Sequence, residues 1–382
     1  MNAKKRLYRI TKTMRKGESE TMNKKALSTL LLTGALLVSA NTSVFAAGVP
    51  TVGTGDENNS ATVSVIKNFE FAEGITTPDA TFAFTATKET ADAPDATITP
   101  ITYNKGDATG NLSNGKYTIS KKSAINFGTF PHAGMYEYNV TETKGDVTGV
   151  TYSTTTYKLR VYVANKADDT GVYVQSITAE DNGTKKDKVL FTNTYVKDGG
   201  SDDGKEALTI EKETTGALAD QTKKFDFKIT LTKAATTTDN TVKGKIGAQE
   251  ITFTYGQETT FQLGHKDKLV FEDLPAGTRY IVTEVGVEDG YVPTVNVIEN
   301  GVKNQEKAGT DKDDLTSAKD GENNNLVGEK ENSVTFVNKF DDNNVPITGI
   351  IENNMPFILL IGVGIAAFGS LAVAKKRKTA EK

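Results

Sequence analysis

The sequence contains no cysteine and no tryptophan, and only two histidines among its 382 residues. Without cysteine the chain can form no disulfide, no thiolate nucleophile and no cysteine-ligated metal site. His132 and His265 alone cannot supply the Cys/His cluster that binds zinc. No phosphate-binding loop, dinucleotide-binding fingerprint or nucleophile elbow is present. The sequence therefore predicts no metal, no cofactor and no enzyme that turns over a substrate.

The first 46 residues have the anatomy of a secretory signal. An apolar run, Leu27–Val38, follows two lysines, and small residues lead up to Ala46. A basic segment, an apolar segment and a Val-Phe-Ala cleavage site are the three parts of such a signal. We expect residues 1–46 to be removed, with Met22 as an alternative start. The other interpretation, an N-terminal membrane anchor, requires a longer apolar run.

The other end of the chain, residues 345–382, carries three features in a fixed order. A short motif is followed by an apolar stretch, Phe357–Ala374, which has no charged residue and is just long enough to cross a bilayer. Four basic residues come next and would remain in the cytoplasm. The motif consists of Val345, Pro346, Ile347, Thr348 and Gly349.

This order resembles the cell-wall sorting signal that sortases read, in which leucine usually stands at the position of Val345. The resemblance implies that a sortase cysteine attacks the Thr348 carbonyl, releases the chain from Gly349 onward and passes the acyl group to an amine. The alternative is a single-pass membrane protein with a chance motif.

The part that remains after both ends are removed, residues 47–348, is acidic. The removed ends hold 14 of the 45 Lys and Arg and 4 of the 49 Asp and Glu, which leaves 31 basic and 45 acidic residues. A net charge of −14 argues against nucleic acid as a partner and for an exported soluble body. Small exported β-domains usually need a covalent staple, and no cysteine is available here to make one.

Short alternating segments separated by Gly and Asn turns fill this body, and no helical period is sustained. Such a pattern is typical of antiparallel sandwiches. We therefore expect an all-β protein of two tandem immunoglobulin-like β-sandwich domains, at residues 58–196 and 205–342, joined by a polar linker at 197–204. We expect a polar, flexible lead at 47–60 and a long surface loop at Glu299–Lys330.

Thirteen strands are expected from this alternation. They are Val63–Phe71, Thr81–Thr87, Lys116–Ser120, Met135–Thr141, Tyr157–Val163, Tyr173–Ile177 and Val189–Tyr195, then Leu208–Glu213, Phe225–Thr232, Glu250–Tyr255, Leu269–Glu272, Tyr280–Val285 and Ser333–Phe340.

Each domain places three polar residues where the alternation requires apolar ones. Successive side chains of a strand point to opposite faces, and these residues share the face of their apolar neighbours. The Lys and Asn are 126 positions apart in both domains, and the Glu follows the Lys by 75 positions in one and 72 in the other. The six residues are Lys67, Glu142 and Asn193 in the first domain and Lys212, Glu284 and Asn338 in the second.

A buried Lys, Glu and Asn are costly unless they satisfy one another, and in contact they have a chemistry available. Burial lowers the pKa of lysine and raises that of glutamate. A neutral amine can attack the amide carbon of Asn, while a protonated Glu polarises the amide oxygen and relays protons so that ammonia leaves. The product is an isopeptide bond between the first and last strands. Alternatively, the Lys extends outward from an edge strand, the Glu follows a strand end and the Asn begins a turn.

The segments around these residues resemble the isopeptide-linkage domain of streptococcal T-antigen-type major pilins, which are sortase-anchored surface proteins of Gram-positive bacteria. The resemblance covers nearly all of residues 58–342 and rests on six segments. They are Val65–Phe69, Tyr138–Glu142, Phe191–Tyr195, Ile210–Lys212, Tyr280–Glu284 and Phe336–Phe340. It implies a pilus backbone subunit at the cell surface, cross-linked within itself and joined through Thr348 to the next subunit or to the wall.

A backbone pilin also needs a lysine that accepts the Thr348 of another subunit. In related pilins this lysine lies a few residues before the isopeptide Asn of the first domain, which implies Lys186, with Lys185 and Lys188 as rivals. The alternative for this segment is a solvated, lysine-rich turn. The implied partners are a sortase, other copies of the chain, minor pilins and peptidoglycan. The alternative function is a singly displayed, wall-anchored adhesin or minor pilin that binds a host surface ligand.

Overall fold

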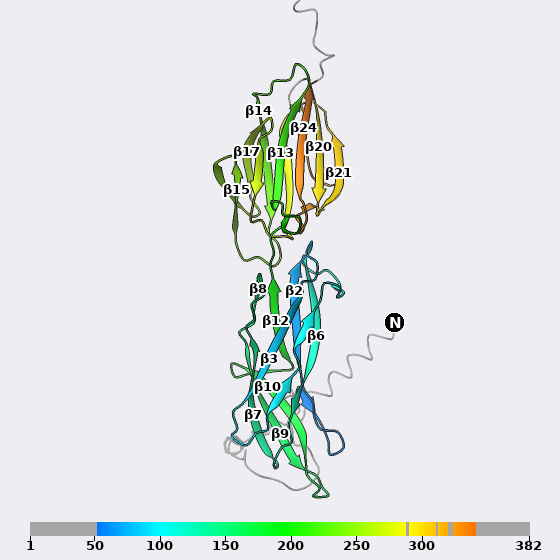
Figure 1. Ribbon diagram of the computed structural model, residues 1–382, viewed down its shortest axis with the longest axis vertical. Helices are drawn as coiled ribbons and strands as arrows, with labels where there is room; N and C mark the ends of the chain where they lie inside the picture. Colours follow the sequence, from blue (N-terminus) through cyan, green and yellow to red (C-terminus); the bar gives the residue numbers. More distant parts are fainter. Residues whose placement is uncertain (1–51, 288–289, 311, 320–323, 341–382) are drawn as a thin grey trace, which may run out of the picture. The chain divides into compact units, whose positions relative to one another are not determined.

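The computed structural model describes residues 52–287, 290–310, 312–319 and 324–340. By their contacts these residues fall in one compact unit. The expected signal segment and the sorting motif with its apolar stretch lie outside the described residues. Within the described part, no helix is long and apolar enough to cross a membrane. The regular structure of the described chain is almost entirely β-strand, in two successive domains (Figure 1).

The first domain is a sandwich of two sheets. One sheet has the strand order β1-β10-β9-β7-β3-β5, with β11 also paired to β10, and the other has the order β4-β6-β2-β12-β8. The strands are β1 (Gly53–Thr54), β2 (Ser64–Ala72), β3 (Ala80–Lys88), β4 (Ala96–Ile98), β5 (Ile101–Tyr103), β6 (Lys116–Phe127), β7 (Gly134–Thr143), β8 (Val150–Thr151), β9 (Thr156–Asn165), β10 (Val172–Asp181), β11 (Thr184–Lys186) and β12 (Val189–Tyr195).

The second domain repeats the two-sheet plan after a 3-10 turn, η1 (Ser201–Asp203). Its sheets have the orders β16-β15-β18-β13-β24-β20-β21 and β17-β14-β19-β22, with β23 also paired to β19. The strands are β13 (Leu208–Thr215), β14 (Lys224–Thr232), β15 (Thr241–Ile246), β16 (Gln249–Thr254), β17 (Glu258–Gly264), β18 (Lys268–Phe271), β19 (Arg279–Glu284), β20 (Tyr291–Glu299), β21 (Val302–Ala308), β22 (Leu315–Thr316), β23 (Asn325–Leu326) and β24 (Ser333–Phe340).

The core of each domain lies between its two sheets and is rich in aromatic side chains. In the first domain the rings of Phe69 on β2 and Phe82 on β3 lie 5.1 Å apart, edge to face. In the second, Phe227 on β14 and Phe336 on β24 lie 5.2 Å apart in the same way. These contacts join opposite sheets, so the expected all-β tandem sandwich is confirmed.

In both domains the first long strand and the last strand are parallel neighbours: β2 pairs with β12, and β13 pairs with β24 (Figure 1). Parallel strands cannot be joined by a tight turn and need a long crossover connection. Here the whole domain is that connection. A covalent bond between these two strands would therefore close a loop around the domain.

Each of the thirteen expected strands overlaps an observed one, and β12 and β24 have the expected bounds. The expected loop at Glu299–Lys330 is wrong. It contains β21, which pairs with β20 at the edge of the sheet, and the short strands β22 and β23. The side chains of β21 are largely exposed, and a charged edge strand has the composition of a loop because only its backbone is paired.

One further expectation needs correction, and the linker makes contacts on which the sequence gives no prediction. The lead at 47–60 was expected to be flexible, but Gly53 and Thr54 pair with β10. The linker at 197–204 is polar as expected, yet it is bound to the second domain: Asp198 bridges to Pro275, and Gly199 N–H donates to the Leu274 carbonyl. Both segments are held by backbone hydrogen bonds, which amino-acid composition does not reveal.

Candidate functional site

The three exceptional residues of the first domain meet in its core. Lys67 lies on β2 and Asn193 on β12, while Glu142 lies on β7 in the opposite sheet. Lys67 Nζ is 2.8 Å from one carboxylate oxygen of Glu142, and Asn193 Nδ2 donates to the other. Asn193 Oδ1 accepts a hydrogen bond from the Ser153 N–H at 2.8 Å. The side chains of Lys67 and Glu142 are both 0% exposed. The carboxylate thus bridges the amine and the amide.

The second domain builds the same arrangement from β13, β19 and β24. Lys212 Nζ lies 3.0 Å from Glu284 Oε1, and Asn338 Nδ2 donates to the same oxygen at 2.6 Å. All three residues are 0% exposed. Among the described residues, Glu284 Oε2 and Asn338 Oδ1 have no hydrogen-bond partner, and such atoms are costly to bury.

Strand register explains why the lysine and asparagine of each domain meet. Lys67 is the register partner of Phe191 and Lys212 that of Phe336, and each Asn follows that partner by two positions. Residues two apart on a strand share a face, so the amine and the amide lie diagonally on the same buried face. The alternative of an outward-pointing lysine on an edge strand is excluded, because β2 and β13 are both internal strands.

Burial shifts the pKa of both lysines and of the second-domain glutamate. It lowers the pKa of Lys67 to about 8, although the hydrogen bond and the charge of Glu142 oppose the shift. It lowers the pKa of Lys212 to about 8 against the same opposition from Glu284. It also raises the pKa of Glu284, which Lys212 and Asn338 only partly offset. In the second domain, lower basicity of the amine and higher basicity of the carboxylate make proton transfer between them easier.

Aromatic rings that the sequence reasoning missed complete both sites. Lys67 Nζ lies 4.5 Å from the ring centroid of Phe82, and Lys212 Nζ lies 4.5 Å from that of Phe225. A repeated Phe-x-Phe pair, which begins 15 positions after one lysine and 13 after the other, is the signal that could have identified them.

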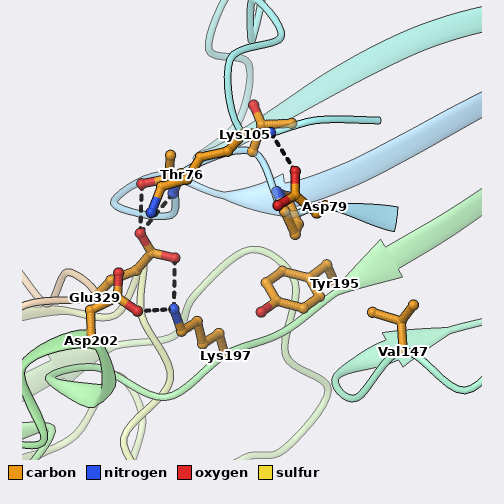
Figure 2. A pocket seen from close by; sticks show the side chains of 10 residues that line it. Thr76, Asp79, Lys105, Val147, Tyr195, Lys197, Asp202 and Glu329 are labelled. Carbon is orange, nitrogen blue, oxygen red and sulfur yellow. Dashed lines mark hydrogen bonds and ion pairs between the residues drawn. The ribbon is translucent and has the colours of Figure 1, made fainter. Parts of the chain in front are cut away.

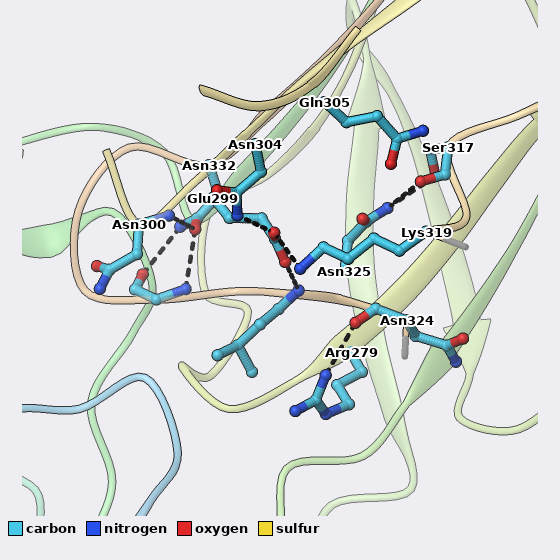
Figure 3. Close-up of polar contacts among 12 residues, drawn as sticks. Arg279, Glu299, Asn300, Asn304, Gln305, Ser317, Lys319, Asn324, Asn325 and Asn332 are labelled. Carbon is cyan, nitrogen blue, oxygen red and sulfur yellow. Dashed lines mark hydrogen bonds and ion pairs between the residues drawn. The ribbon is translucent and has the colours of Figure 1, made fainter. Parts of the chain in front are cut away.

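A third Lys, Glu and Asn set lies in the second domain, outside the two sites (Figure 3). Glu299 at the end of β20 is 4% exposed and accepts hydrogen bonds from Asn304 Nδ2 and the Leu326 N–H. Lys319 Nζ lies 2.5 Å from the same carboxylate. Here, however, the lysine side chain is 33% exposed and Asn304 is exposed. The residue types match those of the two buried sites, but water reaches the amine and the amide.

Figure 2 shows a polar pocket near the linker, which is separate from both sites. Glu329 accepts hydrogen bonds from the Thr76 N–H at 3.0 Å and the Thr76 hydroxyl at 2.7 Å. Lys197 Nζ pairs with Glu329 at 3.2 Å and also with Asp202. No residue of the two buried sites lines the pocket. It therefore has no part in the chemistry available to them.

The lysines expected to accept another subunit precede β12 in the chain. Lys185 and Lys186 belong to the edge strand β11, not to the expected turn, because their backbones pair with Glu180 and Ala179 of β10. The Lys186 side chain is 37% exposed, and its Nζ lies 3.7 Å from Asp181 Oδ2. The expected sortase motif lies outside the described residues. The groups that would form a link between subunits are thus not seen together.

Comparisons with known proteins match both domains. Residues 63–196 match FctA, the Spy0128-like isopeptide containing domain, and residues 206–340 match a domain of unknown function, DUF7601. A pilin of Streptococcus pyogenes serotype M1 is 29% identical over 374 residues, which is 92% of this chain and 98% of that one. The pilus tip adhesin Cpa of Streptococcus pyogenes is 40% identical over 93 residues, 23% of this chain and 13% of its own.

Among solved structures, the major pilin protein T3.2 of Streptococcus pyogenes is 25% identical, with 74% of this chain and 98% of that chain covered and a TM-score of 0.34. The chain is thus a tandem β-sandwich protein whose first domain matches an isopeptide containing domain. The likeness to a pilin along nearly the whole chain supports a relationship to the streptococcal major pilins.

Proposed function

We propose that this chain is a structural subunit of a sortase-assembled cell-surface pilus, and that each of its domains is locked by a self-formed Lys–Asn isopeptide bond. The observation that carries the proposal is the recurrence of the buried Lys–Glu–Asn contact in both domains. The match to an isopeptide-containing domain supports it for the first domain. The second domain matches a family without an assigned function, so there the geometry alone supports it.

The chemistry follows from the contacts. The lysine ammonium gives one proton to the bridging carboxylate, and the neutral amine attacks the side-chain carbonyl carbon of the asparagine. The protonated glutamate, which contacts the amide nitrogen, gives that proton to the departing Nδ2, and the second proton that the lysine nitrogen loses on forming the new bond follows through the same carboxylate. In the first domain the Ser153 N–H, which donates to Asn193 Oδ1, stabilises the charge that develops on the amide oxygen. The bond from that carbon to Nδ2 breaks as the new carbon–nitrogen bond forms. One ammonium ion leaves, and the carboxylate is restored, so each site reacts once.

Such bonds suit a chain that carries tension. The Lys67–Asn193 bond would join β2 to β12, and the Lys212–Asn338 bond would join β13 to β24. Load that enters at one end of a domain could then leave at the other end without peeling the parallel pair apart. A loop of more than a hundred residues closed in this way, treated like a disulfide, stabilises each domain by about 5 kcal/mol.

Polymerisation is the second part of the proposal. Thr348 would be joined through a sortase to Lys186 of another copy, or to peptidoglycan at the base of the pilus. Copies linked head to tail repeat into an open fibre instead of a closed ring. Replacement of Lys186 by Arg keeps the charge but removes a usable nucleophile. Cells that carry this variant and the cognate sortase should lose the ladder of covalent polymers, whereas the ladder should persist in a Lys185→Arg strain.

Intact mass tests the isopeptide bonds directly. Purified residues 47–348 should weigh less than the sequence by two ammonia molecules, and Lys67→Ala and Lys212→Ala should each restore one. A mass equal to that of the sequence would refute the cross-links in both domains.

The similarity to a pilus tip adhesin favours a second candidate, a minor pilin or adhesin displayed singly on the wall. Denaturing gels of the wall fraction distinguish the two. A ladder indicates a polymer of this chain, and a single band indicates the adhesin.

A further inference from the structure

The lysine of each buried site faces one aromatic ring as well as its glutamate. The ring is Phe82 in the first domain and Phe225 in the second, at the same Nζ-to-centroid distance of 4.5 Å. Among the described residues, Glu142 is the hydrogen-bond partner of Lys67 Nζ. The ring thus supplies the second contact that the buried ammonium makes.

The two rings occupy equivalent places in the fold. Each ring lies two positions before a second phenylalanine, which is the register partner of the glutamate. Phe84 lies opposite Glu142 in the first domain, and Phe227 lies opposite Glu284 in the second. The second phenylalanine packs against the residue opposite the lysine, with ring centroids 5.3 Å apart in the first domain and 5.2 Å in the second. Both members of the pair therefore recur in position and in contact.

This recurrence is not a general likeness of the two cores. The buried position two residues after the lysine is Phe69 in one domain and Thr214 in the other. Space at such a position can be filled by side chains of different kinds. The same residue type at the same distance from both amines indicates a requirement set by the amine.

We propose that Phe82 and Phe225 are positioning residues for isopeptide formation, and that the face of each ring holds the ammonium beside its glutamate so that the pair keeps its shared proton until transfer. A cation over an aromatic face is attracted by the ring quadrupole, most strongly when water is excluded. A leucine would fill much of the same space without that attraction. The inference rests on the proposed isopeptide function.

A consequence for pH dependence follows. The reactive pair carries one proton, so bond formation should fall in alkali as the ammonium loses that proton and in acid as the carboxylate gains a second. The ring favours the charged ammonium. It should therefore raise the pH at which the rate of bond formation falls to half in alkali, which we call the alkaline midpoint. Burial alone acts in the opposite direction, because it disfavours the charged amine.

The first domain offers the cleaner test because fewer other charged groups surround its ring. Besides Glu142 on β7, the titratable groups near Lys67 are Tyr103 on β5, whose hydroxyl donates to the Lys67 carbonyl at 2.6 Å, and Lys121 on β6, opposite Lys67 in register and 4.9 Å from the Tyr103 ring. In the second domain Phe225 also has Lys223 Nζ at 6.0 Å.

Further groups contact the backbone around the second-domain lysine. The Asp267 carbonyl accepts a hydrogen bond from the Lys212 N–H, and His265 Nδ1 accepts one from the Thr214 N–H. The decisive variant is therefore Phe82→Leu, and Phe84→Leu is its matched control, since both residues lie on β3 and are buried.

The experiment follows the reaction in the full chain, obtained unreacted in denaturant and refolded over a range of pH. Intact mass gives the loss of ammonia with time, and peptide mapping assigns it to a domain. In Phe82→Leu the alkaline midpoint of the first-domain rate should move to lower pH by about half a unit to one unit. The second-domain bond in the same molecules should keep its own midpoint. Phe84→Leu should change the first-domain rate through packing but leave the midpoint in place.

An unchanged or higher midpoint in Phe82→Leu, or the same shift in Phe84→Leu, overturns the inference. If Phe82→Leu does not fold, Phe225→Leu should lower the alkaline midpoint in the second domain. An unchanged midpoint in Phe225→Leu would then overturn the inference. Absence of ammonia loss from both domains of the unaltered chain refutes the proposed function instead, so the two failures are distinguishable.

Discussion

The replacement of Glu284 by Gln separates the two ways in which the buried glutamate acts. Glutamine has nearly the shape of glutamate and can still contact Asn338, but it cannot accept the lysine proton. No bond should form, and Lys212 should be left buried without a counter-charge. The lost cross-link, which spans 126 positions, removes about 5 kcal/mol of stability. Breaking a buried ion pair from one side costs a further 3 to 5 kcal/mol, roughly.

The sum, about 8 to 10 kcal/mol, is comparable to the whole free energy of unfolding of an ordinary domain. We therefore expect the second domain of Glu284→Gln to be largely unfolded at room temperature. The matched variant Lys212→Met also prevents the bond but leaves no buried cation. Burial raises the pKa of Glu284, so that group can remain neutral. Lys212→Met should lose only the cross-link term and melt about 15 °C below the unaltered domain.

Calorimetry of residues 47–348, combined with intact mass, measures both quantities. Each variant should retain the first-domain bond and lose one ammonia instead of two. The first-domain transition should be the same in both and serves as the internal reference. Loss of two ammonia molecules from Glu284→Gln would refute the proton relay. Equal melting temperatures for the second domain of the two variants would refute the argument from the unpaired charge.

Two further predictions follow from the same contacts. Lys319→Met should leave the number of lost ammonia molecules at two, because the solvated Lys319–Glu299–Asn304 set should not react; a third ammonia lost by the unaltered chain would contradict this. Asn338→Ala should leave an unreacted Lys212 whose folded pKa is about 8, below the ordinary value of about 10.4. From pH 8 to 10.4, roughly, the unfolded chain binds a proton at Lys212 that the folded chain does not bind. The free energy of unfolding should therefore rise with pH by about 3 kcal/mol across this window. Urea titrations that show no such rise would contradict the prediction.

Alternation along single strands was enough to predict much of this protein. It placed Lys67 and Lys212 on core faces, and both are fully buried. It also gave the bounds of Val189–Tyr195 and Ser333–Phe340, whose side chains alternate strongly. Strand β20 was not predicted although its side chains alternate too; Pro293 lies within it, and proline is uncommon inside a strand. Alternation in the sequence reveals strands that bury one face. It does not reveal a strand such as β21, whose backbone is paired but whose side chains are largely exposed.

The sites required information that one strand does not contain. Alternation assigns Glu142 to a buried face, but only the sheet order places β7 opposite β2 and β12. The parallel pairing of first and last strands is likewise a property of the whole domain. The proposed roles of Phe82 and Phe225 depend on their distance from an amine on another sheet. Long-range pairing thus decided which of the expected residues could meet.

The three Lys, Glu and Asn sets of this chain show why residue type alone cannot define such a site. In each set a carboxylate contacts both an amine and an amide. The set around Glu299 differs in exposure: its lysine side chain is 33% exposed, against 0% for Lys67 and Lys212. A hydrated ammonium has little tendency to give its proton to a carboxylate, whereas a buried pair gains by mutual neutralisation. Burial between two sheets, and not the presence of the three residue types, is therefore what makes the proposed reaction available.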